Sequence, residues 1–203
     1  MTKKIAIMGS GNGSNFEAIV NYFKDKDVEI TCISDVSSAY ILERAKLLNI
    51  KSEIVPAEKN FEYFSNNKFD LIVLAGYMNI LPPNVLHLGK FINIHPSLLP
   101  AFKGKDAIKR AFFAGIKVSG VTVHHVEERV DSGKIIAQYP VLIGNLTHFD
   151  EFEKEIHQIE HMLYPIVIEK ILNDEVFDFS DLIGGCNKGG CSSGGCGGCG
   201  GCH

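Results

Sequence analysis

The N-terminal half of the chain alternates between short, continuously apolar runs and segments with helical spacing. The apolar runs cover residues 3–8, 28–33, 52–55, 70–74 and 90–94. Runs of this length are typical of strands that are buried on both faces. The segments between them predict helices at residues 15–23, 39–48 and 82–88. Strands that alternate with helices predict a parallel, doubly wound, Rossmann-like α/β sheet.

The pattern changes after a further predicted helix at residues 107–114. Residues 118–127 and 134–143 are longer, alternating runs, which are typical of an antiparallel strand pair joined by a loop. The sheet is therefore predicted to be mostly parallel, with an antiparallel pair near its C-terminal end. Helical spacing of apolar residues over 150–172 then predicts an amphipathic closing helix. Pro165 lies inside this helix, so we expect a kink or break near Tyr164.

Composition divides the chain into two parts. Residues 184–203 hold five of the six cysteines and ten of the twenty glycines, without apolar periodicity. We therefore predict one domain over residues 1–183 and a disordered, low-complexity Gly/Cys-rich tail over 184–203. The single cysteine of the domain, Cys32, lies in an apolar stretch. This usage favours a reducing compartment and predicts a cytoplasmic protein.

Charge and hydropathy limit the classes of partner. The chain has 20 basic and 24 acidic residues, and no basic run could neutralise several phosphates of a nucleic acid. No apolar run is long enough for a bilayer, and the four apolar residues after Lys4 are too few for a signal peptide. These features favour a small-molecule partner over a nucleic acid or a membrane. They leave the oligomeric state open.

A glycine-rich loop follows the first predicted strand at residues 9–15 and leads directly into a helix. Exposed amides and the positive end of the helix suit an anion such as a phosphate, with Ser14 or Asn15 as the helix cap. The dinucleotide fingerprint is incomplete, because Ser14 or Phe16 stands where its last glycine belongs. Asp35 nevertheless lies where a ribose-binding acid is expected. NAD binding and a purely structural turn remain alternatives.

Two other regions carry polar residues suited to catalysis. Asn93 and His95 follow the fifth predicted strand, where the ligand crevice of an open sheet lies, and their spacing points both side chains to one side. A capping asparagine beside a surface histidine is the simpler interpretation. Asp131 lies between the two long strands, in an Asp-Ser-Gly sequence that is usually a turn. Its spacing leaves open whether it reaches His95. Thr122 is predicted to share a strand face with His124.

The closing helix contains His157, Glu160 and His161, which fit the H-x-x-E-H pattern of inverted zinc peptidases. A catalytic zinc needs three protein ligands, and the sequence offers no clear third one. The favoured interpretation is therefore a polar stripe of His157, Glu160 and Tyr164, which is solvated or faces a substrate.

Together, these motifs resemble the folate-dependent formyltransferases that act on glycinamide ribonucleotide in purine biosynthesis. The matching segments follow the order of that family and cover nearly all of residues 1–183: 11–15, 74–81, 93–100, 120–124, 130–133, 160–161 and 164–165. Segment 93–100 is common to a wider formyltransferase group, whereas the glycine loop selects this branch of it. The resemblance implies transfer of a formyl group from 10-formyltetrahydrofolate to the amine of glycinamide ribonucleotide, with no metal required.

The resemblance also implies roles for single residues. The positions that match catalytic residues of the family are Asn93, His95 and Asp131, with Thr122 in support. Substrate-binding positions are matched by Gly13, Ser14, Asn15, Gly76, Pro96 and Glu160, of which the first three hold the phosphate and the last the glycinamide. The folate pocket is matched by the backbone of Met78, Asn79, Ile80 and Leu81. Asn79 stands where the family often has arginine.

These residue types fit formyl transfer. Attack of an amine on a formyl carbon creates a tetrahedral oxyanion, which Asn93 and a protonated His95 would stabilise with donated hydrogen bonds. Asp131 would orient the imidazole and favour its charged form.

Three alternatives stay open. Formyltetrahydrofolate hydrolases share the catalytic trio but carry a regulatory N-terminal domain. Methionyl-tRNA formyltransferases share segment 93–100 but need a basic RNA-binding domain. A protein of a different class, a metal-binding module, would use the tail, where Cys196, Cys199 and Cys202 form C-x-x-C pairs that suit zinc.

Overall fold

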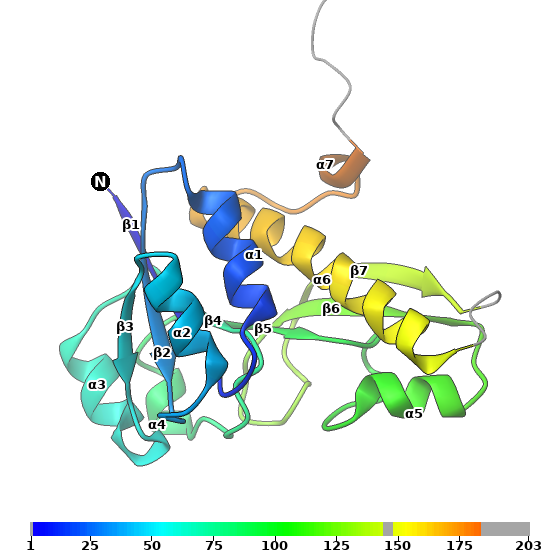
Figure 1. Cartoon of the computed structure of the whole chain (residues 1–203), viewed down its shortest axis with the longest axis horizontal. Coiled ribbons are helices and arrows are strands. Elements are labelled where there is room, and N and C mark those ends of the chain that lie inside the picture. Colours follow the sequence, from blue (N-terminus) through cyan, green and yellow to red (C-terminus); the bar gives the residue numbers. More distant parts are fainter. Residues whose placement is uncertain (1, 144–147, 184–203) are drawn as a thin grey trace, which may run out of the picture.

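A computed structural model describes residues 2–143 and 148–183, and these residues form a seven-stranded sheet with helices packed against it (Figure 1). The strands are β1 (Lys3–Met8), β2 (Val28–Ser34), β3 (Lys51–Ile54), β4 (Leu71–Leu74), β5 (Phe91–His95), β6 (Val118–His125) and β7 (Ile135–Leu142). Their spatial order is β3-β2-β1-β4-β5-β6-β7.

The sheet is mixed, as the sequence predicts. Strands β1 to β5 pair in parallel, because each is joined to the next by a helical crossover that returns the chain to the same edge. Strand β6 pairs antiparallel with both β5 and β7. The predicted Rossmann-like class with an antiparallel pair near the C-terminal end is therefore confirmed.

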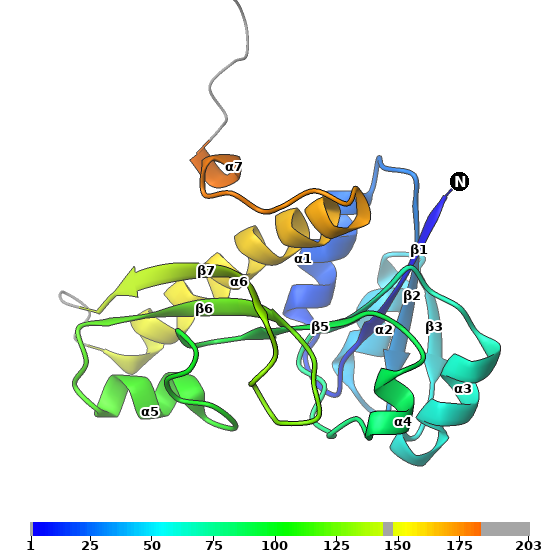
Figure 2. The ribbon, with the colours of Figure 1, turned by 180° about the vertical axis from the view of Figure 1, so that it is seen from behind.

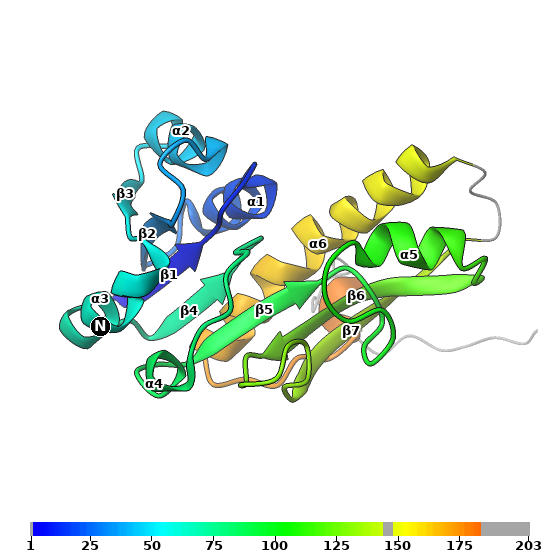
Figure 3. The ribbon, with the colours of Figure 1, turned by 90° about the horizontal axis from the view of Figure 1, so that it is seen from below.

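Helices cover both faces of the sheet, which explains why β1 is apolar throughout. Ile5 and Ile7 belong to the core beneath α1 (Ser14–Phe23), α2 (Tyr40–Leu47), α5 (Ala107–Phe113) and α6 (Phe149–Leu172). Ala6 and Met8 belong to a second core with α3 (Asn60–Asn66) and α4 (Pro83–Leu86). Figure 2 shows α3 and α4 on the face turned to the viewer, and Figure 3 shows the two helix layers on opposite sides of the sheet.

Most predicted elements lie within two residues of their observed bounds, but three short helices are not predicted. These are the 3-10 helix η1 (Ala57–Lys59), α3 and α7 (Ser180–Ile183). Helix α3 buries Phe64 but leaves Phe61 47% exposed, so its apolar residues form no continuous stripe. Without such a stripe, the helical period is weak in the sequence.

Of the kink or break predicted near Tyr164, the break is wrong. Helix α6 continues through Pro165 to Leu172, and Tyr164 and Val167, close to the proline, are fully buried. Packing against the sheet holds this part of the helix in place, although the proline supplies no amide hydrogen. Even with α6 at 24 residues, no helix in the described part of the chain is long and apolar enough to cross a membrane.

Candidate active site

A cavity of about 980 Å³ lies at the carboxyl edge of the parallel strands. Segments that are far apart in the sequence line it: the glycine loop after β1, residues 74–81 after β4, the end of β5, the β6–β7 loop and one face of α6. All the predicted catalytic, substrate-binding and folate-binding residues of the domain except Thr122 line this one cavity. Strand ends at the same edge of a parallel sheet converge in this way.

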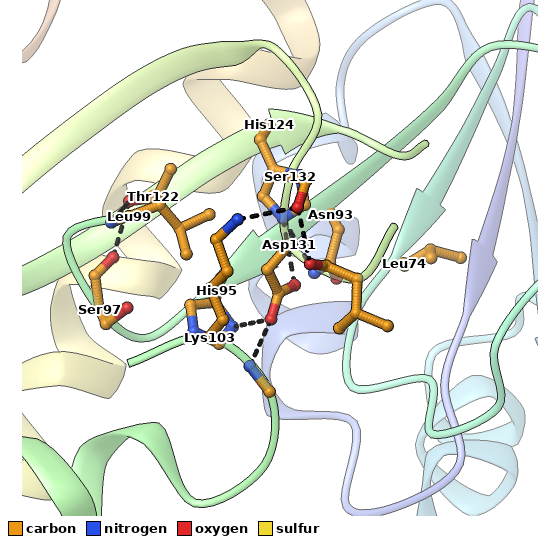
Figure 4. A network of polar contacts seen from close by, with 12 residues as sticks. Leu74, Asn93, His95, Ser97, Leu99, Lys103, Thr122, His124, Asp131 and Ser132 are labelled. Atoms are coloured by element: carbon orange, nitrogen blue, oxygen red, sulfur yellow. Dashed lines mark hydrogen bonds and ion pairs between the residues drawn. The ribbon is translucent and has the colours of Figure 1, made fainter. Parts of the chain in front are cut away.

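The three predicted catalytic residues lie beside one another (Figure 4). Strand β5 presents Asn93 and His95 on one face, opposite His124 and Thr122 of β6. The β6–β7 loop brings in Asp131, whose Oδ2 lies 3.3 Å from His95 Nδ1 and accepts a 2.7 Å hydrogen bond from the Gly104 amide. The Asp-Ser-Gly sequence is therefore more than a turn, because its carboxylate contacts the histidine 36 positions earlier in the chain.

Asp131 is held ionised by its neighbours. Burial alone raises the pKa of this carboxyl group, but the contacts with His124, the Gly104 amide and His95 outweigh it and lower the pKa below its usual value. The backbone of Asp131 has a φ of 48°, in the left-handed region that residues with a Cβ atom seldom adopt. The loop thus places a carboxylate against two buried imidazoles.

His95 is buried and has an acceptor at each ring nitrogen. Nε2 lies 3.0 Å from the Phe102 carbonyl oxygen, so this nitrogen carries a hydrogen, and Nδ1 faces Asp131. Burial lowers the pKa of His95, against the opposing effects of Asp131 and the Phe102 carbonyl. Asp131 favours the charged imidazole as expected, but the burial of His95 has the larger effect. The pKa of the His95 imidazole therefore lies below its ordinary value.

His124 is a member of this cluster that the sequence does not reveal as a site residue. Its Nε2 lies 3.5 Å from Asp131 Oδ1 and 3.3 Å from Asn93 Nδ2, and the residue is 2% exposed. The predicted face shared with Thr122 is correct, and that face is the signal that could have identified it. Thr122 lies outside the cavity, where its hydroxyl donates to the Ser97 carbonyl and accepts from the Leu99 amide. Thr122 thus supports the loop that follows His95.

The glycine loop leaves the N-terminus of α1 open. Gly13, with a φ of 78°, is the N-cap and makes no side-chain cap, so the expected cap by Ser14 or Asn15 is wrong. Asn15 instead donates to Glu160 Oε2 at 3.1 Å, while its own Oδ1 is buried without a hydrogen-bond partner. Uncapped amides at a helix N-terminus suit an anion, and the unpaired Asn15 oxygen can accept a hydrogen bond from a ligand.

Asp35 does not serve as a free ribose-binding acid. Its Oδ1 accepts a 2.6 Å hydrogen bond from Ser10, and its Oδ2 accepts a 2.5 Å hydrogen bond from Asn79 Nδ2. Both carboxylate oxygens are therefore committed within the protein. Asp35 is therefore not available to bind the ribose of NAD, which weakens the NAD-binding alternative.

Helix α6 contributes Glu160, which is 4% exposed and contacts His157 Nδ1 at 2.9 Å. This contact raises the pKa of His157. Tyr164 is not part of the predicted polar stripe, since it is fully buried and donates to the carbonyls of Leu74 and Ile92. In the part of the chain that the structure describes, no group of three or more His, Cys, Asp or Glu side chains is placed to hold a metal. Cys196, Cys199 and Cys202 lie outside the described residues.

These observations define an open α/β fold whose carboxyl edge carries a cavity in which Asn93, His95, His124 and Asp131 form one polar cluster. Comparison with known proteins is consistent with this class. Residues 3–168 match the formyl transferase family, and the chain belongs to that family.

Within the family, the chain is similar to enzymes of one kind. It is 41% identical over 185 residues to the phosphoribosylglycinamide formyltransferase of Bacillus subtilis (strain 168), with 84% of this chain and 95% of the relative covered. It is 39% identical to that of Haemophilus influenzae, with 82% and 86% covered. The crystal structure of glycinamide ribonucleotide transformylase 1 from Geobacillus kaustophilus matches with a TM-score of 0.79 at 38% identity, covering 85% of this chain and 100% of that one.

Proposed function

We propose that the chain transfers the formyl group of 10-formyltetrahydrofolate to the amine of glycinamide ribonucleotide, a step of purine biosynthesis. The observation that carries the proposal is the convergence of three parts in one cavity: an uncapped glycine loop for a phosphate, the His95–Asp131 pair, and the segment 76–81. Relatives that are about two-fifths identical carry the name of this activity.

The two substrates fit different ends of the cavity. The amides of Gly13, Ser14 and Asn15 suit the ribonucleotide phosphate, and the buried Glu160 carboxylate suits the glycinamide amine. The folate donor fits the other end, where Met78 and Ile80 are 63% and 73% exposed and offer an apolar rim. This arrangement brings the amine and the formyl group together near Asn93 and His95.

In the proposed reaction, the amine nitrogen attacks the formyl carbon, and the carbonyl electron pair moves to the formyl oxygen. Asn93 Nδ2 and His95 Nε2 donate hydrogen bonds to this oxyanion. His95 Nε2 bonds to the Phe102 carbonyl in the present structure, so it must exchange this acceptor for the formyl oxygen.

A proton then moves from the new C–N nitrogen to the departing nitrogen of the folate, as the carbonyl forms again and the old C–N bond breaks. A water molecule between the two nitrogens relays this proton, accepting the proton of the attacking nitrogen as it gives one of its own to the departing nitrogen. Asp131 lies 3.3 Å from His95 Nδ1, where its charge orients the ring and favours the protonated form, which donates the stronger hydrogen bond from Nε2 to the oxyanion.

The test is a product analysis with purified protein, 10-formyltetrahydrofolate and glycinamide ribonucleotide. We expect one formylated ribonucleotide for each tetrahydrofolate released. Formate release without a formylated ribonucleotide would identify a hydrolase and contradict the proposal. We also propose that residues 1–183 form the catalytic domain. The cytoplasmic location of the protein stays a prediction.

A further inference from the structure

Three loops at the carboxyl edge of the sheet are joined by one group of side chains: Ser10, Asp35 and Asn79. Ser10 follows β1, Asp35 follows β2, and Asn79 lies in the segment after β4. Asp35 accepts hydrogen bonds from Ser10 Oγ at 2.6 Å and from Asn79 Nδ2 at 2.5 Å. We call these three residues the Ser10 cluster.

The backbone of the segment after β4 is also bonded to Ser10. The Ser10 amide donates to the Gly76 carbonyl at 3.0 Å, and Ser10 Oγ accepts from the Met78 amide at 3.0 Å. Residues 76–79 therefore make two hydrogen bonds with Ser10 and one with Asp35, and the Tyr77 hydroxyl accepts a fourth from Asn60 Nδ2 at 2.9 Å. Ser10 is itself a residue of the glycine loop.

Apolar burial cannot fix this segment by itself. Met78 is 63% exposed and Ile80 is 73% exposed, so the first strongly buried side chain after the turn is Leu81, at 4%. Gly76 has a φ of 77°, so the backbone turns sharply at the start of the segment. Within residues 76–79 only the Tyr77 side chain packs against the core, so polar contacts are needed to select one backbone conformation for the exposed Met78 and Asn79.

We propose that Ser10 and Asp35 are positioning residues, which hold residues 76–79 in the conformation that binds the formyl donor. The inference rests on the proposed function, because it assigns the donor to this segment. It also gives Asn79 a role through its contact with Asp35 rather than through the donor. Asp35 thereby keeps the donor segment in a fixed position relative to the phosphate-binding loop.

The kinetic test compares Asp35→Ala, Ser10→Ala and Asn79→Ala with the natural chain. Loss of hydrogen bonds to a charged group predicts a donor KM for Asp35→Ala raised about 10-fold. We expect kcat and the ribonucleotide KM of this variant to change less than about 2-fold, since its contacts lie outside the reacting groups. Asp35→Asn keeps one acceptor oxygen and should restore most of the donor affinity. Ser37→Ala, an exposed serine in the same loop, is the matched control.

A second measurement does not depend on activity. In Ser10→Ala, the Met78 amide loses its acceptor, so its hydrogen exchange by NMR should rise about 5-fold to 10-fold. Amides of the buried strand β4 should keep their exchange rates. If the chain showed no formyl transfer at all, the proposed function would fail, and faster Met78 exchange would still establish the Ser10 cluster.

Two results would overturn the inference. One is a donor KM unchanged in Asp35→Ala and Asn79→Ala together with unchanged Met78 exchange in Ser10→Ala. The other is a rise in both the donor KM and the ribonucleotide KM of the cluster variants, together with a lower melting temperature. This pattern would indicate general destabilisation. Asn79 is exposed, so Asn79→Ala is the variant that tests the contact with the least risk to folding.

Discussion

At the scale of residues, the chemistry of His95 depends on groups that lie elsewhere in the sequence. Burial lowers its pKa, whereas the Asp131 carboxylate and the Phe102 carbonyl raise it. Asp131 in turn contacts His124, and His124 contacts Asn93. Changes at any of these positions should therefore alter a common step of the reaction.

We predict that Asn93→Ala, His95→Ala and Asp131→Ala each lower kcat by ~10²-fold or more while changing KM little, because each removes a contact made in the transition state. Steady-state kinetics with both substrates measures the effect. His87→Ala, a change at an exposed histidine beyond α4, is the control. Normal turnover in His95→Ala would contradict the proposed mechanism.

A titration tests the electrostatics of the same pair. The pKa of His95 should lie below the ordinary value of 6.5, because the buried imidazole is poorly solvated when charged. Asp131→Asn removes a negative charge that favours the imidazolium, so it should lower this pKa further. NMR titration of the His95 ring measures both values, with Asp25→Asn, an exposed carboxylate after α1, as the control. A higher pKa in Asp131→Asn would show that Asp131 does not act through charge.

At the scale of elements, the glycine loop depends on its contact with α2. A Cβ atom at Gly13 would lie 2.7 Å from the Ile41 side chain, and the φ of 78° is one that other residues rarely adopt. The loop therefore needs glycine at this position both for its own backbone and for the packing of α2.

Gly13→Ala should destabilise the fold by at least about 1–2 kcal/mol, the cost of a left-handed backbone for a residue with a Cβ. It should also raise the ribonucleotide KM about 10-fold or more, since the amides move away from the phosphate. Urea denaturation and kinetics measure the two effects. Gly115→Ala is the control: Gly115 shares the positive φ, has open space around an added Cβ and does not line the cavity, so this variant should lose stability without a change in the ribonucleotide KM. If Gly13→Ala had the same ribonucleotide KM as Gly115→Ala, the assignment of the glycine loop to the phosphate would be contradicted.

Tertiary packing determines whether helix α6 continues through Pro165. Pro165 predicts a break, yet Tyr164 beside it donates hydrogen bonds to the carbonyls of Leu74 at 2.9 Å and Ile92 at 3.2 Å. These bonds fasten the helix to β4 and β5. Glu160, one turn earlier, is thereby directed at the cavity.

At the scale of the whole molecule, the domain boundary can be tested by truncation. The formyl transferase match ends at residue 168, and every residue that lines the cavity lies between Gly11 and Glu160 in the sequence. A chain of residues 1–183 should therefore keep the kcat, both KM values and the melting temperature of the full chain without added metal. Formyl-transfer kinetics and thermal unfolding measure this. A large loss of activity would place the boundary after residue 183.

Sequence pattern alone determines much of this architecture. The apolar runs of β1 and β4 predict strands buried on both faces, because no other short element needs apolar side chains on each side. The spacing of Asn93 and His95 predicts a shared face, since side chains alternate along a strand. The resemblance in the motifs extends this to formyl transfer, in agreement with the family match.

Tertiary structure alone decides which distant residues meet. His124 joins Asn93 through the register of β5 with β6, and Asp131 reaches His95 through a left-handed backbone that its turn sequence does not specify. Asp35 bonds to Ser10 and Asn79 rather than lying free for a ribose. Local patterns report the period and burial of each element, because those depend on near neighbours along the chain. Contacts between loops depend on the order of the strands and on how the helices pack against the sheet. The spacing of residues in the sequence does not determine either of these.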